Sequence, residues 1–468
     1  MEAVNTRVTR SNKEFSPYIL RGEDIILPSI RAQDLFDRAA SDMGAREDGE
    51  EEELPIQVHV QPMEENQATA PEITSLEDLS QTQSPRRSPR IQRVYEFDPS
   101  HSAMERRRMK AHIRYRNNRN KRREADQDQR GSTLKACALK HMQAMRTSGS
   151  AIRTTFRIPR REWTGPRIPY DPNVYTLSEM LGIPGMAKVP WGNIRETRYL
   201  RVEGGRRIGV LNGWPDDRWP GVMREVRMAQ QDVHSNVRYT SKMQSGRRGA
   251  FDAISFGASF GGGQTHPMML SHSEHNAGVL DRFRSNVHVQ RVIRSQDYAM
   301  QAHFPALHNM YNSVLDRLID DDDDIHRNFP QTCFAASTLN SGRTATLRHV
   351  DHLNLFCGMC AVFNIGNFDY QAGGHLVLWD LGLVIEFPPG CSILFPSALL
   401  AHSNVPIGLG ENRASLTQFS AAGLFRWVHN GGMTDANYWE QASVRQRKAW
   451  LQHRERLPEI GLSMLPVD

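Results

Sequence analysis

Residues 347–355 read Leu-Arg-His-Val-Asp-His-Leu-Asn-Leu, a short run of the kind that predicts a β-strand. Similar short runs lie on either side, separated by turns rich in glycine and proline, at residues 332–339, 360–365, 375–379, 384–387, 392–395 and 414–420. About seven or eight short antiparallel strands at this spacing predict a sandwich or a jelly roll. We therefore expect a jelly-roll core over residues 331–430.

Helical patterns flank this β-rich region. Apolar residues from Ser295 to Ile319 recur near helical spacing, and Pro305 is expected to interrupt or kink that helix. The segment Thr434–Arg456 predicts a C-terminal helix within residues 431–468, and residues 151–330 predict irregular and helical elements that form the N-terminal part of the catalytic domain. The expected fold class is mainly β with flanking helices (α+β), with extensions at both ends.

Charge is strongly segregated in the first third of the chain. Residues 1–83 hold 7 Lys/Arg and 18 Asp/Glu, a net charge of −11, whereas residues 84–123 hold 14 and 3, a net charge of +11. We expect residues 1–83 to be an acidic disordered tail. Residues 84–150 predict a basic arm. It is interpreted either as a solvated segment with a nuclear localisation signal or as an arm that contacts DNA phosphates. These two interpretations are compatible.

The composition of the 468-residue chain excludes several protein classes. Five cysteines are too few for a secreted disulfide framework, which favours a reducing compartment. No stretch approaches the ~20 apolar residues that span a bilayer, and the N-terminus lacks an apolar signal core. The expectation is a soluble intracellular protein with no membrane partner.

The strongest chemical pattern is His349 with Asp351, followed downstream by His402. Residues two apart in a strand face the same side, so this imidazole and carboxylate can bind one metal ion, and His402 supplies a third ligand. Two histidines and one carboxylate form the facial triad of non-haem Fe(II) oxygenases, which leaves positions for a chelating co-substrate and O₂. Because the chain has 18 histidines, a lone His-x-Asp is weak evidence, and a hydrogen-bonded strand histidine is the ordinary alternative.

Basic and polar residues near this pattern strengthen the metal hypothesis. The far carboxylate of 2-oxoglutarate needs a rigid bidentate partner, which the guanidinium of Arg413 provides, and Ser415 shares its strand face. Asn340, Arg343 and Arg348, just upstream of the triad, are candidates for the iron-proximal carboxylate, although a β-turn with surface arginines is an equal alternative. Cys357 and Cys360 form one C-x-x-C without a second pair, so no zinc site is expected there.

The stretch from Thr346 to Trp427 resembles the TET/JBP family of iron- and 2-oxoglutarate-dependent DNA base oxygenases, most closely its fungal branch from mushrooms. The residues that carry the resemblance are Leu-Arg-His-Val-Asp-His-Leu-Asn (347–354), Gly-Gly-His-Leu-Val-Leu-Trp (373–379), Phe-Pro-Pro-Gly (387–390), His402 and Arg-Ala-Ser (413–415). Residues 257–267 extend it more faintly. The resemblance implies a double-stranded β-helix fold.

Carried over by position, the resemblance implies that His349, Asp351 and His402 are the catalytic iron ligands and that Arg413 and Ser415 hold 2-oxoglutarate. These residues would make the chain an Fe(II)- and 2-oxoglutarate-dependent enzyme.

The resemblance also suggests residues that contact the DNA base. Asn354 matches a position where the family places Asn or Asp to hydrogen-bond the flipped base, and Phe419 matches an aromatic pocket residue. Ala421 stands where relatives that act on 5-methylcytosine often carry a histidine, so base preference stays open. Gly262 and Gln264 belong to a glycine-rich loop that could approach a nucleic-acid backbone, with a structural turn as the alternative.

The expected function is that of a nuclear dioxygenase acting on methylated double-stranded DNA. It would flip 5-methylcytosine out of the duplex and oxidise the methyl group to hydroxymethyl, formyl and carboxyl products. One alternative is oxidative demethylation of N6-methyladenine in duplex DNA. The alternative from another class is a non-catalytic jelly-roll module that binds DNA. The sequence leaves the oligomeric state open.

Overall fold

The computed structural model describes residues 7–8, 14–15, 22–36, 163–261 and 264–467. Contacts divide the chain into two units, and the second, Val60–Ile152, lies outside the described residues. The basic arm expected over residues 84–150 therefore lies outside them too, as do residues 151–162 and most of the acidic segment. Within the described residues, no helix combines the length and apolar character needed to cross a membrane.

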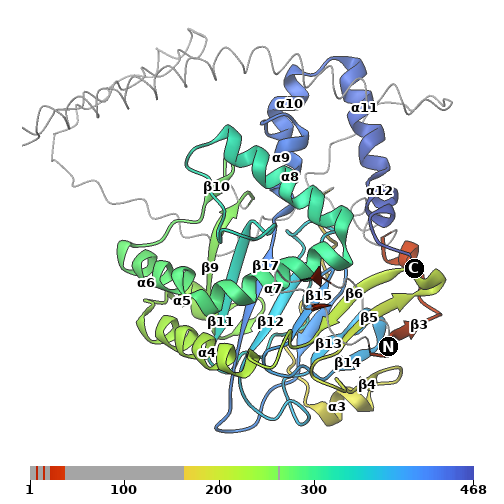
Figure 1. The fold of residues 1–468 in the computed structure, drawn as a ribbon. Coiled ribbons are helices and arrows are strands. Elements are labelled where there is room, and N and C mark those ends of the chain that lie inside the picture. The colour runs from red at the N-terminus through yellow and green to blue at the C-terminus, as the bar shows by residue number, and fades with distance from the viewer. Residues whose placement is uncertain (1–6, 9–13, 16–21, 37–162, 262–263, 468) are drawn as a thin grey trace, which may run out of the picture. The chain divides into compact units, whose positions relative to one another are not determined.

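A nine-stranded sheet forms the centre of the folded unit (Figure 1). From one edge to the other its strands are β10 (Met268–Met269), β9 (Asp252–Ser259), β11 (Ala336–Ser341), β17 (Asn412–Phe419), β12 (Cys360–Asn367), β15 (Ser392–Phe395), β6 (Arg207–Asn212), β5 (Thr197–Val202) and β3 (Ile25–Leu27). Neighbouring strands are antiparallel except β3 and β5, which are parallel.

A smaller four-stranded sheet completes the jelly roll. Its strand order is β16 (His402–Asn404), β13 (Leu376–Leu378), β14 (Leu383–Ile385) and β4 (Ala187–Val189). From β11 onward the chain passes repeatedly between the sheets: β12, β15 and β17 join the large one, whereas β13, β14 and β16 join the small one. This alternation is the double-stranded β-helix expected from the sequence, and the α+β fold class is confirmed.

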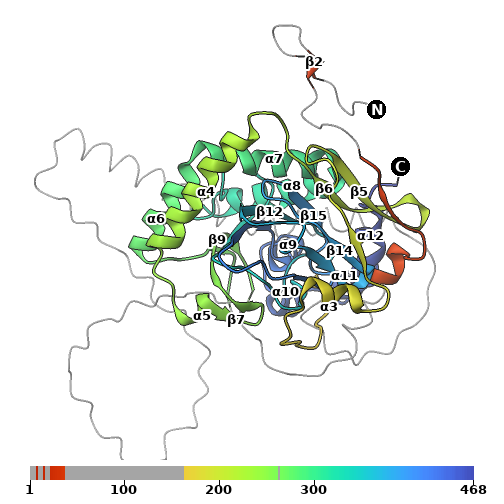
Figure 2. The same ribbon diagram turned by 90° about the horizontal axis from the view of Figure 1, so that it is seen from below.

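Helices cover the outer faces of both sheets. The helices α4 (Trp219–Asn236), α6 (Glu274–Ser285), α7 (Val287–His303) and α8 (Pro305–Asp321) lie on one side of the large sheet (Figure 2). A buried apolar cluster joins α4, α6 and α7 to the outward side chains of this sheet, such as Leu339 and Leu416. On the small sheet, Met180 of α3 (Leu177–Gly182) packs against Val377 and Val384.

The predicted helix over 295–319 is present as two helices. Phe304 caps the end of α7, and Pro305 starts α8 at a position where its missing N–H costs no hydrogen bond. The helix predicted over Thr434–Arg456 is likewise two helices, α10 (Asp435–Gln441) and α11 (Val444–Glu455). The helix α9 (Ala422–His429) precedes them, and α12 (Leu457–Ser463) follows. Ser443 separates α10 from α11 because its side chain caps α11 in a capping box with Gln446.

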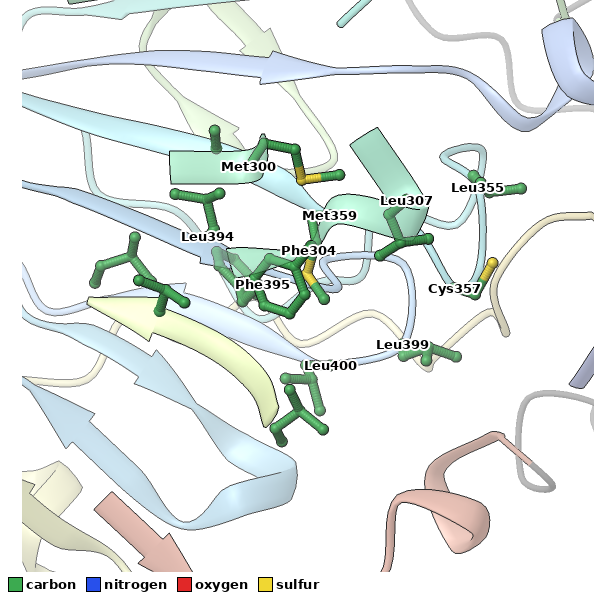
Figure 3. Close-up of a cluster of buried hydrophobic side chains, with 14 of the residues drawn as sticks. Met300, Phe304, Leu307, Leu355, Cys357, Met359, Leu394, Phe395, Leu399 and Leu400 are labelled. Atoms are coloured by element: carbon green, nitrogen blue, oxygen red, sulfur yellow. The ribbon is translucent and has the colours of Figure 1, made fainter. Parts of the chain in front are cut away.

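The main apolar core extends from α7 and α8 through the large sheet toward the small one. Figure 3 shows Met300, Phe304 and Leu394 at one part of it and Leu399 and Leu400 at another.

The remaining short elements are β1 (Arg7–Val8), β2 (Glu14–Phe15), η1 (Glu203–Gly205), α5 (Ser241–Gln244), β7 (Ser245–Gly246), β8 (Gly249–Ala250) and η2 (Trp379–Leu381).

Two expectations need correction. Residues 347–355 do not form a regular strand: His349 makes a single antiparallel bridge with His402, and the chain then turns where the Asn354 N–H donates to the Asp351 carbonyl over 2.9 Å. Residues 22–36 fell in the range expected to be disordered, yet they contain β3 and a helical turn at 32–36. They are ordered because Leu35 and Phe36 are buried, and Phe36 lies edge-on to Phe356 at 5.9 Å between ring centroids.

Phe36 tests this second correction. Phe36→Ala should lower the free energy of unfolding by about 3–5 kcal/mol, because the ring is 1% exposed and its removal leaves a cavity. Ile26→Ala, at a position 67% exposed, is the matched control and should change it by less than about 0.5 kcal/mol. Urea unfolding of the full chain measures both. Equal, small changes in the free energy of unfolding in the two variants would indicate that residues 22–36 are a disordered tail.

Candidate metal centre and active site

The jelly roll brings His349 and His402 together through their backbones. Each N–H donates to the other residue's carbonyl, over 3.0 Å from His349 and 2.8 Å from His402. The Nδ1 atom of His349 donates to the Leu347 carbonyl at 2.7 Å, and that of His402 to the Leu400 carbonyl at 2.9 Å. Because a carbonyl only accepts, these contacts fix the tautomer and leave both Nε2 lone pairs available to a metal ion.

Asp351 completes the triad. Its Oδ1 lies 3.7 Å from His349 Nε2, and its Oδ2 lies 3.9 Å from His402 Nε2. The three donor atoms lie within 4.8 Å of one another, at separations too long for direct hydrogen bonds. Two imidazole nitrogens and one carboxylate on adjacent backbone segments are the donor set of a non-haem Fe(II) site, so the triad fits a ferrous ion.

Electrostatics keep the three ligands in their metal-binding forms. Burial, with His402 nearby, holds the pKa of His349 well below its ordinary value, and burial also lowers the pKa of His402. For Asp351, burial favours a higher pKa, but His402, His349 and Arg248 outweigh it, so the net pKa is lowered. Near neutral pH the site holds two neutral imidazoles and one carboxylate, as metal binding requires.

The turn after β15 positions Asp351. The Ser397 carbonyl accepts the Asp351 N–H at 2.9 Å, and the Ser397 hydroxyl, 3.4 Å from Asn354 Nδ2, helps to lower the pKa of the Asp351 carboxyl. Ser397 is 1% exposed. It therefore orients the carboxylate ligand in the way that outer hydrogen-bond partners usually orient metal ligands.

A second contact to Asp351 comes from the hairpin β7–β8, whose two-residue turn is Arg247-Arg248. The Arg248 carbonyl accepts the Leu347 N–H at 2.9 Å, and Arg247 donates to the Val350 carbonyl at 3.1 Å. The Arg248 Nη1 lies 4.0 Å from Asp351 Oδ1. Sequence patterns do not single out Arg248, because the only local signal is a pair of arginines between two glycines.

Residues 163–165 also lie against the metal-binding segment. The Trp163 carbonyl accepts the Phe356 N–H at 2.9 Å, and the Gly165 N–H donates to the His352 carbonyl at 2.8 Å. A Cβ atom at Gly165 would stand 2.0 Å from the Ala398 carbonyl, next to Ser397, so this close approach requires glycine.

Arg413 lies at the start of β17, on the side of the strand shared with Ser415. Its side chain is 1% exposed, and Nη1 donates to the Thr344 carbonyl at 3.0 Å. Burial lowers the pKa of Arg413 to about 10, so the guanidinium stays charged near neutral pH. Its Nε has no hydrogen-bond partner, and no carboxylate of the described residues pairs with it. A buried cation without an anion is costly, so this position fits a carboxylate of a bound ligand.

Asn340 belongs to the same polar surface. It pairs in register with Ser415, and its Nδ2 donates to the Ser415 hydroxyl at 3.1 Å. Its Oδ1 is buried and has no partner among the described residues. Together with Arg413, these groups line the inner side of the large sheet and fit the polar end of 2-oxoglutarate.

Arg343 is placed differently. Its backbone forms a bridge with Arg413, but its side chain is exposed and donates to the Ile407 carbonyl at 3.1 Å. The described contacts connect Arg343 to the loop before β17 and not to the triad.

The residues expected to contact a base are only partly gathered. Asn354 and Phe419 are half-buried, and Asn354 forms a bridge with Ala421. Ala421 is 3% exposed and packs in the main apolar core, because its backbone both pairs with Asn354 and precedes α9. The side chain of Gln264 accepts the Gly261 N–H at 3.0 Å within its own loop, and Gly262 lies outside the described residues.

Solved structures that share limited similarity with the chain include the following three. NgTET1 in complex with 5mC DNA is 14% identical, with a TM-score of 0.36 over 51% of this chain and 84% of that one. The viral collagen prolyl hydroxylase vCPH from Paramecium Bursaria Chlorella virus-1, in a 2OG complex, is 14% identical, with a TM-score of 0.16 over 18% and 57%. An oxidoreductase of the 2OG-Fe(II) oxygenase family from Burkholderia pseudomallei is 15% identical, with a TM-score of 0.25 over 44% and 89%.

No protein-family profile and no curated protein matches the sequence. Similarity at these levels carries no argument about activity, so a functional assignment depends on the side chains of the site.

Ser397 tests how the metal ligands are held. Ser397→Ala should weaken metal binding about 10-fold, because Asp351 loses a nearby hydroxyl that favours its charged form while all three ligands remain. The matched control is Ser337→Ala, since Ser337 is also 1% exposed but bonds Asn328. Anaerobic titration with Mn(II) measures both affinities. An unchanged affinity in Ser397→Ala would show that this hydroxyl does not orient the ligand.

Proposed function

We propose that the protein is an Fe(II)- and 2-oxoglutarate-dependent dioxygenase that oxidises the methyl group of 5-methylcytosine in DNA. One observation carries the proposal: the two-histidine, one-carboxylate triad shares a jelly roll with a buried arginine that has no anionic partner among the described residues. Residues 344–349 connect the arginine to the triad, since the Thr344 carbonyl accepts a hydrogen bond from Arg413 and His349 is the first metal ligand.

The residues of the site have distinct roles in this proposal. With Fe(II) and 2-oxoglutarate bound, oxidative decarboxylation would supply the oxidant that removes hydrogen from the base methyl group. Arg413 and the Ser415 hydroxyl bind the far carboxylate, and Asn340 orients that hydroxyl. Arg248, 4.0 Å from Asp351, is better placed than the exposed Arg343 for the iron-proximal carboxylate.

The DNA substrate is the finer part of the proposal. The basic arm of residues 84–150 would neutralise phosphates of methylated duplex DNA and address the protein to the nucleus. The methyl group must reach the metal, so the base would be flipped from the duplex. The motifs of the sequence further suggest a member of the TET/JBP family, from its fungal branch.

Asn354 would contact the flipped base, and its chemistry leaves a second substrate open. An amide offers one donor and one acceptor, and both cytosine and adenine present an exocyclic amine beside a ring-nitrogen acceptor. Asn354 alone therefore does not separate 5-methylcytosine from N6-methyladenine. Oxidation of the adenine N6-methyl group would release formaldehyde and leave unmethylated adenine in the DNA.

Mass spectrometry of nucleosides tests the reaction. The full chain with Fe(II), O₂ and 2-oxoglutarate should convert 5-methylcytosine duplexes to hydroxymethyl and further oxidised products, with succinate formed alongside. Asp351→Ala, which removes a metal ligand but keeps the fold, should form none. Reaction of N6-methyladenine duplexes alone would select the demethylase alternative. Tight DNA binding without succinate from either duplex would select the non-catalytic module.

Arg413 separates co-substrate binding from metal binding. Arg413→Ala should raise the KM for 2-oxoglutarate about 10- to 100-fold, because hydrogen bonds to charged groups contribute about 1.5–3 kcal/mol, while Mn(II) affinity stays unchanged. Arg343→Ala is the matched control and should leave that KM as it is. Adding 2-oxoglutarate should raise the Tm of the wild type but not of Arg413→Ala. Equal KM values in the two variants would contradict the role assigned to Arg413.

A further inference from the structure

We propose that Asp297, His308 and Cys333 form a second metal site, a structural one suited to zinc, separate from the triad in the jelly roll. Asp297 lies on α7, His308 lies in the first turns of α8, and Cys333 lies in the segment that leads into β11. Their ligand atoms lie within 4.8 Å of one another. This inference is independent of the activity proposed above.

The distances in this cluster resemble those around an ion. His308 Nε2 lies 3.3 Å from one carboxylate oxygen of Asp297 and 3.4 Å from the other. A direct charge-assisted hydrogen bond would be shorter, about 2.7–2.9 Å. Ligands at bond lengths of about 2.0–2.3 Å in a tetrahedron are separated by about 3.3–3.8 Å, which matches the observed spacing.

The donor chemistry also favours zinc. Imidazole, thiolate and carboxylate are the three ligand types that Zn²⁺ binds in proteins. The thiolate together with the carboxylate would neutralise the two charges of the ion, so the occupied site carries no net charge. Binding replaces the Cys333 S–H bond with an S–Zn bond and releases the proton to solvent.

Hydrogen bonds around the cluster already orient the ligands. The Cys333 N–H donates to Asp297 Oδ1 at 2.8 Å, which leaves Oδ2 for an ion. Cys333 is 1% exposed and His308 is 7% exposed, whereas Asp297 is half-buried. The fourth position would therefore open toward solvent on the side of Asp297 and hold a water molecule.

The Cys333 thiol holds its proton when no cation is bound, and a metal ion must displace that proton. Burial raises the pKa of the Cys333 thiol well above its ordinary value, and Asp297 raises it further. Without a cation the thiol stays protonated beside a carboxylate. A bound cation would connect α7, α8 and the start of β11, and so would fix the helical layer to the jelly roll.

Cobalt substitution tests the site, because only a sulfur ligand gives a thiolate-to-cobalt charge-transfer band in the near ultraviolet. The facial triad has no sulfur, and Asp351→Ala removes its metal. Cys137, outside the described residues, is replaced by serine in the same background to remove its thiol. Metal-free full-chain protein with Cys137→Ser and Asp351→Ala should bind one Co(II) per chain and show the band, and Zn(II) should abolish it.

Variants of the three ligands decide the outcome. Cys333→Ser in this background should lose the band, whereas Cys391→Ser, at another fully buried free cysteine, should keep it. His308→Gln keeps the thiol, and should weaken Co(II) binding by at least about 10-fold, so it replaces Cys333→Ser if that variant fails to fold. Zn(II) should raise the Tm of the background protein but not of Cys333→Ser. A folded background protein without the band, or a band that survives Cys333→Ser, overturns the proposal.

Discussion

The pair of backbone hydrogen bonds between His349 and His402 is the contact on which the site depends. It joins an irregular segment to β16, the edge strand of the small sheet, and so fixes both imidazoles at once. Each ring is then oriented by the carbonyl two residues before it, through the same contact in both histidines. A single backbone bridge therefore sets the position of two ligands, and only the carboxylate needs separate support.

That support comes from distant parts of the chain. Ser397 holds Asp351 from the turn after β15, and Arg248 approaches it from the hairpin β7–β8. On the inner side of the large sheet, Arg413 and Asn340 each keep a polar atom that no other described residue pairs with. Buried groups of this kind cost stability in the empty protein, and the site gains preorganisation for an anionic ligand in return.

Much of the jelly roll was predictable, because short apolar runs between glycine and proline turns have a strong signal. β15 has the predicted bounds, and the helix break at Pro305 follows from the chemistry of proline. β16 was not predicted, because its three residues, His-Ser-Asn, are polar and lack strand periodicity. The triad could be proposed from the His-x-Asp spacing together with Arg413, Ser415 and the family resemblance. The backbone bridge that brings His349 to His402 could not be predicted, since residues 347–355 were expected to form a strand.

Contacts between segments far apart in the sequence could not be predicted. Arg248 and Ser397 have no local pattern that connects them to Asp351, and Ala421 is buried in the core where a pocket residue was expected. The acidic composition around residues 22–36 hid Phe36, since a few buried side chains order a segment that is polar on average.

Phe356 contacts both residues that border the segment 37–162, which lies outside the described residues. Phe36 packs against its ring, and the Trp163 carbonyl accepts its N–H, so the residues on either side of 37–162 in the sequence are both held at one residue. The basic stretch therefore lies between two fixed positions of the chain. For a chain segment between two fixed ends, each doubling of its length costs only about 0.6 kcal/mol of closure free energy, so changes in the length of such a segment cost little. Cleavage of the backbone within it would leave two pieces that stay associated through β3, β5 and the aromatic contact.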